Sequence, residues 1–180
     1  MMLSSVQGTR TTLKGAKYVS VSPFCDERGA FVLFWENEAL LASGLTFNPN
    51  TCAFSHNLKS HTLRGLHSQR APYEQSKFVM CSRGRIWDVI VDLRRDSPSY
   101  LDWAGVELTE TSGLAVFIPP GYAHGFVTLS DDSTLTYLMD GVYQPDFAIT
   151  VRWDDPTIKI EWPVSNPILS ARDRTANFID

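Results

Sequence analysis

Short runs of β-branched and aromatic residues, separated by turn sequences, recur along most of the chain. Such runs, with Gly, Pro, Asn and Asp between them, are typical of strands joined by tight connections. A helical pattern is clear only over 37–43, which Gly44 ends, and Ser170 is placed to cap a second short helix. Many short strands without helices between them predict an all-β sandwich or small barrel. The expected strands are 31–35, 52–58, 61–66, 77–83, 86–93, 114–118, 125–129, 133–139 and 149–153.

The run 86–93 predicts a strand with two distinct faces. Side chains alternate along a strand, so the odd-numbered residues from Trp87 to Leu93 should share one face. The even-numbered residues from Ile86 to Asp92 should share the other face. Only Gly84-Arg85 separates this run from 77–83, and a two-residue connection of this kind predicts a β-hairpin.

Composition places the chain among soluble one-domain proteins. A length of 180 residues lets one domain bury a core without disulfides or a structural metal, and the three cysteines lack zinc-like spacing. No apolar stretch approaches the roughly 20 residues that span a bilayer, and the first residues lack the apolar block of a secretory signal. The net charge of -4 argues against broad nucleic-acid binding. We expect a cytoplasmic protein with no nucleic-acid partner and no membrane partner.

Segment 62–77 combines reactive polar side chains with an apolar strand context. In a regular strand Arg64 and His67 would point to opposite faces, because their separation is odd. Gly65 lies between them and could host a β-bulge that turns both side chains inward. A solvated strand end with a surface arginine is the competing interpretation. The polar side chains of the segment are Arg64, His67, Gln69, Glu74 and Lys77.

Segment 118–126 (IPPGYAHGF) places His124 directly after a rigid Pro-Pro-Gly turn. A histidine there can ligate a metal, bind an anion or hydrogen-bond a neighbouring carbonyl group, and the residues alone do not separate these roles. Tyr137 and Tyr143 are six residues apart, so a continuous strand would place them on one face. A tyrosine in a β core is, however, more often a packing residue than an acid.

Sequence motifs for nucleophilic catalysis or phosphate loops do not occur. The chain has no GxSxG, GxxxxGK[ST], GxGxxG or HExxH sequence. Asp88 and Asp92 are expected to be structural unless Lys77 faces them. The remaining His, Lys, Arg and Tyr side chains suit removal of a proton beside a carbonyl group, with cations that stabilise an enolate and a phosphate.

Six motifs follow one another from residue 24 onward: FCDERGAF at 24–31, TLRGLHSQRAPYEQSKFV at 62–79, GRIWDVIVDLRRDSPSY at 84–100, FIPPGYAHGFVTLSDDSTLTYLMDGVY at 117–143, RWDDPTIKIEWP at 152–163 and LSARD at 169–173. RGLH followed at this distance by IPPGYAHGF is a specific signal. In these motifs the chain resembles the dTDP-4-dehydrorhamnose 3,5-epimerase family of nucleotide-sugar enzymes. The resemblance implies a single cupin-like jelly-roll domain over 1–180, a homodimer, and no metal or organic cofactor. Residues 1–23 would be an N-terminal arm that could reach across the dimer interface.

The resemblance also assigns roles residue by residue. His67 of RGLH matches the base that removes the proton next to the C4 ketone of the sugar, and Asp173 of SARD matches the carboxylate that orients this imidazole. Tyr137 matches the acid that returns a proton to the opposite face of the carbon. Lys77 matches the cation beside the developing enolate oxygen. The positions that match substrate contacts are Arg28, Arg64, His124, Tyr143 and Arg172.

The implied enzyme is an isomerase that inverts C3, C5 or both in a nucleoside-diphosphate-linked 4-keto-6-deoxy sugar, within deoxysugar or polysaccharide biosynthesis. The sequence departs from the family where the nucleobase and the sugar bind, with Leu33 and Ala148 in place of acidic residues. The sequence therefore does not distinguish dTDP, CDP and GDP as the carrier nucleotide.

Two other functions fit parts of the sequence. A metal-dependent cupin, an oxygenase or an isomerase, would use His67, His124 and Glu74 as ligands. Against it, Gln69 stands where metal cupins carry the second histidine of a His-x-His pair. A non-catalytic sugar-binding jelly roll would keep the scaffold without turnover, although simple binding needs no matched acid and base.

Overall fold

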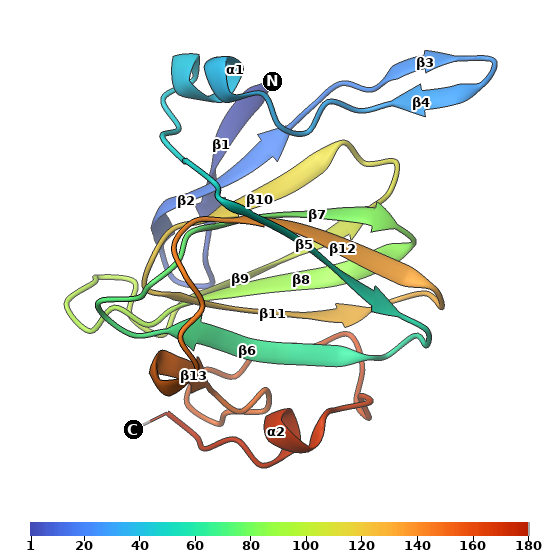
Figure 1. Cartoon of the computed structure of the whole chain (residues 1–180). Coiled ribbons are helices and arrows are strands. Elements are labelled where there is room, and N and C mark those ends of the chain that lie inside the picture. Colours follow the sequence, from blue (N-terminus) through green and yellow to red (C-terminus); the bar gives the residue numbers. More distant parts are fainter. Residues whose placement is uncertain (180) are drawn as a thin grey trace.

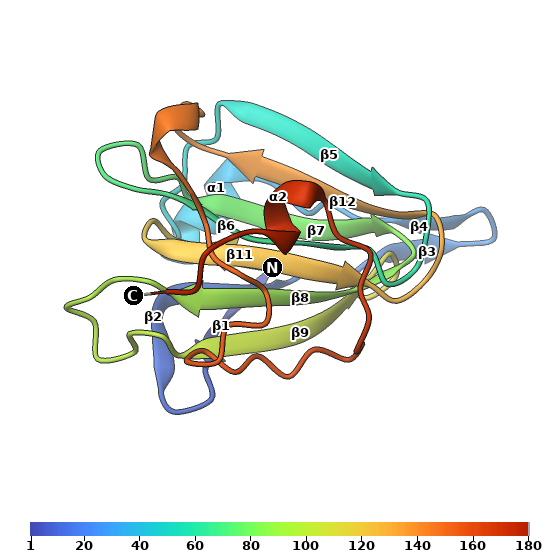
Figure 2. The ribbon, with the colours of Figure 1, turned by 90° about the horizontal axis from the view of Figure 1, so that it is seen from below.

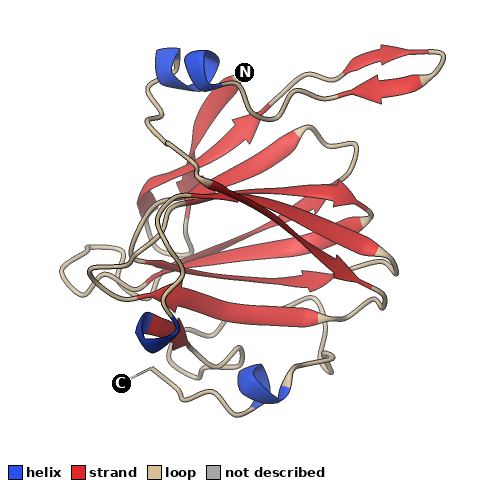
Figure 3. Ribbon diagram, in the orientation of Figure 1, coloured by secondary structure: helices blue, strands red, loops and turns tan. Residues whose placement is uncertain are grey.

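Two antiparallel β-sheets face each other and form the body of the protein (Figures 1 and 3). The structure is a computed structural model that describes residues 1–179. The six-stranded sheet contains, in spatial order, β1 (Met2–Gln7), β2 (Thr12–Ser20), β10 (Leu114–Ile118), β7 (Lys77–Arg83), β12 (Ser133–Met139) and β5 (Thr51–Asn57). The five-stranded sheet contains β13 (Ala148–Thr150), β6 (Leu63–Gln69), β11 (Tyr122–Thr128), β8 (Arg85–Asp92) and β9 (Trp103–Thr109).

The chain passes from one sheet to the other at almost every step between β5 and β12, which is typical of a jelly roll. The expected all-β jelly roll is therefore confirmed. The expected hairpin at Gly84-Arg85 is wrong, because β7 and β8 lie in different sheets and β8 pairs with β11 and β9. Gly84 turns the chain across the sandwich with a φ of +75°. A short connection with glycine suits both a hairpin and such a crossing, so the local sequence does not distinguish them.

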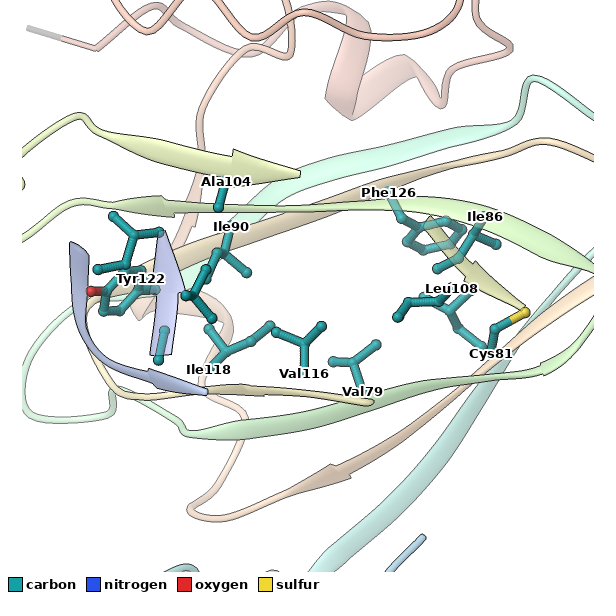
Figure 4. Packing of buried hydrophobic residues seen from close by; sticks show 14 residues of the cluster. Val79, Cys81, Ile86, Ile90, Ala104, Leu108, Val116, Ile118, Tyr122 and Phe126 are labelled. Atoms are coloured by element: carbon teal, nitrogen blue, oxygen red, sulfur yellow. The ribbon is translucent and has the colours of Figure 1, made fainter. Parts of the chain in front are cut away.

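Apolar side chains from both sheets fill the space between them (Figure 4). Ile86 and Ile90 of β8 point into this interior, whereas Val89 and Val91 pack on the outer face of the sheet. The two-faced pattern expected for this strand is confirmed. The C-terminal segment covers the outer face, as Figure 2 shows, and each large side chain buried beneath it contributes about 1.5–3 kcal/mol. Burial on β8 thus holds the C-terminal segment in place.

Both short helices expected from the sequence are confirmed. α1 (Asn37–Ala42) ends before Gly44, which has a φ of +90°. α2 (Ala171–Arg174) follows Ser170, whose Oγ accepts a hydrogen bond from the backbone N–H of Asp173 at 3.1 Å. A 3₁₀ helix, η1 (Pro145–Phe147), precedes β13. Over residues 1–179, no helix is both long enough and apolar enough to cross a membrane.

The N-terminal residues 1–23 contribute two strands, β1 and β2, to the six-stranded sheet. β1 and β2 pair with each other, and β2 pairs with β10, so both strands extend the six-stranded sheet at one edge. Val6, Leu13 and Val19 are fully buried there. Because Ser, Lys and Gly interrupt the apolar alternation of this segment, its sequence carries no clear strand signal.

The strand expected over 31–35 is wrong, because the chain leaves strand conformation after Phe31. A two-stranded hairpin precedes this segment and projects away from the sandwich (Figure 1). It consists of β3 (Phe24–Asp26) and β4 (Gly29–Phe31). The other expected strands are present: 77–83, 114–118 and 133–139 have the observed bounds, and the rest differ at their ends. β9 is an additional strand that the sequence pattern did not predict.

Candidate active site

A cavity of about 300 Å³ lies between the two sheets. Arg64 and His67 of β6 and His124 of β11 line it from the five-stranded sheet. Lys77 of β7 and Tyr137 of β12 line it from the six-stranded sheet. The structure thus brings together five of the residues that the sequence singled out, with the histidines and the arginine on one sheet and the lysine and the tyrosine on the other.

A β-bulge turns both Arg64 and His67 into the cavity, as the sequence predicted. His67 lies opposite His124 of β11, and Arg64 lies opposite the residue two positions further along β11. Directly opposed residues share one face of a sheet, so the extra residue of β6 brings both side chains to the same side. Gly65 permits this geometry, because its φ is +137° and a Cβ there would lie 2.6 Å from Gly125 Cα.

His67 and Asp173 form a short hydrogen-bonded pair. His67 Nε2 lies 2.6 Å from Asp173 Oδ1, and the two side chains are 39% and 4% exposed. Burial by itself would raise the pKa of the Asp173 carboxyl, but hydrogen bonds from His67, Ser170 and the Gly65 N–H, with the charge of His67, hold that pKa below its usual value. The carboxylate accepts the proton on Nε2, which leaves the Nδ1 lone pair to act as a base.

A second histidine–carboxylate pair is more deeply buried. His124 Nε2 lies 2.6 Å from Asp88 Oδ2, and the side chains are 5% and 1% exposed. The other oxygen, Oδ1, is buried and has no hydrogen-bond partner within the described chain. The charge of Asp88 raises the pKa of both Lys77 and Tyr137. Asp88 therefore belongs to the site, and its one sequence signal was a charged residue between Ile86 and Ile90 on the inward face of 86–93.

Lys77 is the buried cation of the cavity. Burial lowers the pKa of its ammonium group from 10.5 to about 8, and the negative charge of Asp88 acts in the opposite direction. Its Nζ donates a hydrogen bond to the backbone carbonyl of His67 at 3.4 Å. A cation held in a low-dielectric cavity interacts with a developing anion more strongly than it would in water.

Tyr137 presents a phenol that keeps its proton. Burial raises the pKa of Tyr137, the charge of Asp88 raises it further, and Arg64 acts in the opposite direction. Its ring stands edge-on to that of His124, with the centroids 5.9 Å apart. The ring also packs against the core between the sheets. Tyr137 is thus both a packing residue and a protonated phenol that lines the cavity.

Tyr143 and Arg172 line a neighbouring hollow of about 180 Å³, which shares His67 and Lys77 with the main cavity. Arg172 Nε donates a hydrogen bond to Thr150 Oγ1 at 2.8 Å. Tyr143 is 57% exposed.

Arg28 is not brought to the cavity by its own chain. It lies at the turn of the β3–β4 hairpin, and its side chain is 85% exposed. Its guanidinium pairs with Asp26 of the same hairpin. The fold of one chain therefore does not place Arg28 in contact with a substrate bound in this cavity.

The ligand set of the metal-cupin alternative is not assembled. Glu74 lines a separate hollow, whereas His67 and His124 line the main cavity and each hold a carboxylate through Nε2. Gln69 is structural, because its amide nitrogen donates to two backbone carbonyls. Among residues 1–179, no three His, Cys, Asp or Glu side chains are grouped so that they could hold a metal ion.

Comparisons with known proteins agree with this geometry. The family described as dTDP-4-dehydrorhamnose 3,5-epimerase matches residues 10–180. The Salmonella typhimurium enzyme of that name is 37% identical over 175 residues, which cover 95% of this chain and 94% of the relative.

Solved structures give the same result. The crystal structure of dTDP-4-dehydrorhamnose 3,5-epimerase from Bacillus anthracis, with TDP and PPi bound, has a TM-score of 0.91 at 35% identity and covers 97% of this chain and 99% of that one. The Legionella pneumophila dTDP-6-deoxy-D-glucose-3,5-epimerase in complex with dTDP-4-keto-L-rhamnose has a TM-score of 0.88 at 29% identity, over 98% of this chain and 93% of that one. With its cavity, its ordered motifs and these relatives, the chain belongs to the dTDP-4-dehydrorhamnose 3,5-epimerase family.

Proposed function

We propose that this protein is a cofactor-independent epimerase that inverts C3, C5 or both in a nucleoside-diphosphate-linked 4-keto-6-deoxy sugar of deoxysugar biosynthesis. The observation that carries the proposal is the placement of His67 and Tyr137 on opposite sheets around one cavity. Inversion of a stereocentre needs a base on one face of the carbon and an acid on the other. A 4-keto group acidifies the hydrogens of both C3 and C5, so one base and one acid can serve either carbon.

The base is His67. Its Nδ1 takes the hydrogen from the carbon beside the ketone, the C–H electron pair forms the enolate double bond, and the carbonyl pair moves onto oxygen. Asp173 supports the imidazolium through Nε2, and Lys77 stabilises the enolate oxygen. Tyr137 then donates its phenol proton to the opposite face of the same carbon. After the product leaves, His67 gives its proton to solvent and the tyrosinate regains one.

The remaining cations hold the nucleotide part of the substrate. The forked donors of Arg64 and Arg172 match the oxygens of a diphosphate, and His124 lines the main cavity beside Arg64. Tyr143 and Arg172 lie in the adjoining hollow, so they are placed beside the end of the substrate that leaves the main cavity.

The enzyme is a cytoplasmic homodimer in this proposal. Phe24 and Phe31 of the projecting hairpin are 70% and 65% exposed and offer an apolar surface that a second copy would cover. Arg28 of the hairpin would then contact the nucleotide bound by that second copy. The free thiols of Cys25 and Cys52 suit a reducing compartment. Sedimentation equilibrium should give twice the 20.2 kDa chain mass, and a monomer mass would contradict the dimer.

The test of the function is a panel of dTDP-, CDP- and GDP-linked 4-keto-6-deoxy sugars incubated with the protein in deuterated water. NMR spectra should show solvent deuterium at C3, C5 or both for at least one carrier, with inverted product. The panel identifies the carrier and the position of exchange together. Binding of several members without exchange would instead support the non-catalytic sugar-binding jelly roll, and exchange that requires a stoichiometric metal would support the metal cupin.

The rate should fall as pH rises through about 8, because the neutral amine that forms above the pKa of Lys77 no longer stabilises the enolate. Below that pKa the ammonium group is charged, so this group does not limit the rate at lower pH. The measurement is kcat/KM for exchange from about pH 6 to about pH 10. Lys77→Arg stays charged over this range and should lack the alkaline fall. An unchanged fall in Lys77→Arg would assign the titration to another group.

Asp88→Asn should move this alkaline fall to lower pH. The charge of Asp88 raises the pKa of Lys77, so its removal lets burial lower that pKa further. The amide oxygen can still accept the hydrogen bond from His124, which preserves the fold. Asp131→Asn is the matched control, because this exposed carboxylate pairs with Lys59 on the surface. A fall that stays in place or moves to higher pH in Asp88→Asn would contradict the coupling.

A further inference from the structure

The inner face of β5 forms one wall of the cavity. Ala53, Ser55 and Asn57 occupy alternate positions of this edge strand and pair with inward-facing residues of β12, among them Tyr137. Directly paired residues share a face, so these three side chains lie on the same side of the sheet as Tyr137. Ala53 and Ser55 line the cavity itself.

Asn57 is 2% exposed, and both ends of its amide are hydrogen-bonded. Nδ2 donates to the backbone carbonyls of Ser55 and Ser133 at 3.0 and 3.2 Å, and these two bonds orient the amide. Oδ1 therefore faces Arg64 and accepts a hydrogen bond from its Nε at 2.8 Å. Because the protein binds Nε, the guanidinium plane is fixed and its two terminal nitrogens remain for a ligand.

Ser55 carries a hydroxyl that lacks a protein partner. Its Oγ is buried and forms no hydrogen bond to any residue from 1 to 179, although Ser55 lines the cavity. A buried hydroxyl without a partner is unfavourable, and a bound molecule that supplies the missing hydrogen bond removes that cost. The neighbouring Ala53 offers no polar side chain, so Ser55 is the polar group beside Tyr137 on this wall.

We propose roles for two residues of β5, Asn57 and Ser55, in binding the sugar nucleotide. Asn57 is a positioning residue that aims the terminal nitrogens of Arg64 at the diphosphate. The Ser55 hydroxyl hydrogen-bonds an oxygen of the hexose, because it lies near Tyr137, where the reacting carbon sits. This proposal takes from the proposed function the identity of the ligand and the position of its reacting carbon beside Tyr137. Both parts of it are tested by ligand binding in the absence of turnover.

Titration calorimetry with dTDP, CDP and GDP first selects the tightest of the three as the probe. Asn57→Ala should weaken binding of the probe about tenfold, since Arg64 loses its fixed orientation, and Arg64→Ala should weaken it at least as much. Because Asn57 acts through Arg64, adding Asn57→Ala to Arg64→Ala should cause no further loss. Additive losses in the double variant, or unchanged binding by Asn57→Ala, would overturn the positioning role.

Leu135→Val is the control for strand stability. Leu135 pairs directly with Ser55 and is fully buried, and it packs in the core between the sheets. Leu135→Val should lower the unfolding temperature while affinity for the probe stays within about twofold. A loss of affinity as large as that of Asn57→Ala would assign the effect to strand stability and would overturn the positioning role.

Ser55 is tested with the glucose derivative of the selected nucleotide, dTDP-glucose for dTDP. Ser55→Ala should weaken its binding about five- to tenfold and leave the affinity for the bare nucleoside diphosphate unchanged. Unchanged affinity for the sugar nucleotide, or equal losses for both ligands, would overturn the hexose contact. A wild-type protein that binds these ligands but catalyses no isotope exchange contradicts the proposed function alone and leaves this proposal standing on its binding data.

Discussion

His67→Ala should abolish incorporation of solvent deuterium into the ketosugar, with a fall in rate of at least about 10²–10⁴-fold. The variant removes the imidazole that lines the cavity and supplies the proposed base Nδ1, and whose Nε2 lies 2.6 Å from Asp173 Oδ1. No proton then leaves the carbon beside the ketone, so neither the enolate nor the inverted product forms. The measurement is the NMR exchange rate in deuterated water for the carrier selected by the panel.

His56→Ala is the matched control for that loss. His56 lies on β5 and contacts Thr134 and Asp132 at the surface, so its removal should leave the exchange rate unchanged. His67 lies on the cavity wall and belongs to none of the hydrophobic core clusters, so circular dichroism of His67→Ala should show an unchanged fold. Near-normal exchange in a folded His67→Ala protein would mean that another group is the base.

The sequence predicted β5 to β8 and β10 to β13, where β-branched and aromatic residues cluster between turn sequences. β8 is the clearest example, because its even-numbered residues face the interior and its odd-numbered residues face the C-terminal segment. β1 and β2 were missed because Ser, Lys and Gly dilute the alternation around Val6 and Leu13. The hairpin expected at Gly84-Arg85 failed for another reason. A local sequence indicates a turn, whereas distant strands decide which sheet receives the next strand.

The same division holds for the site. The bulge at Gly65 was predictable, because two residues three positions apart on a regular strand cannot share a face. The hydrogen-bond partners of the functional side chains were not predictable from the local sequence. His124, for example, is held by Asp88, 36 positions away, and the two meet only when β8 pairs with β11. Family resemblance predicted that His67 is the base. Only the structure shows that its Nε2, and not its Nδ1, contacts Asp173.

Tyr137→Phe should separate exchange from inversion. His67 can still remove the proton, exchange it with solvent through its partly exposed ring, and return a deuteron to the same face. The opposite face has lost its donor, so net inversion should fall at least about 10²-fold while deuterium accumulates in sugar of unchanged configuration. Coupling constants in the NMR spectrum distinguish retained from inverted sugar, so one sample reports both rates.

Tyr18→Phe is the matched control, because Tyr18 also packs against the core between the sheets and burial also raises the pKa of its phenol. That variant should retain both exchange and inversion, which would show that the loss in Tyr137→Phe follows from the position of the phenol and not from a buried hydroxyl in general. Equal losses of exchange and inversion in Tyr137→Phe would mean that the phenol acts before or during proton removal. The acid would then have to be sought among the other proton donors that line the cavity.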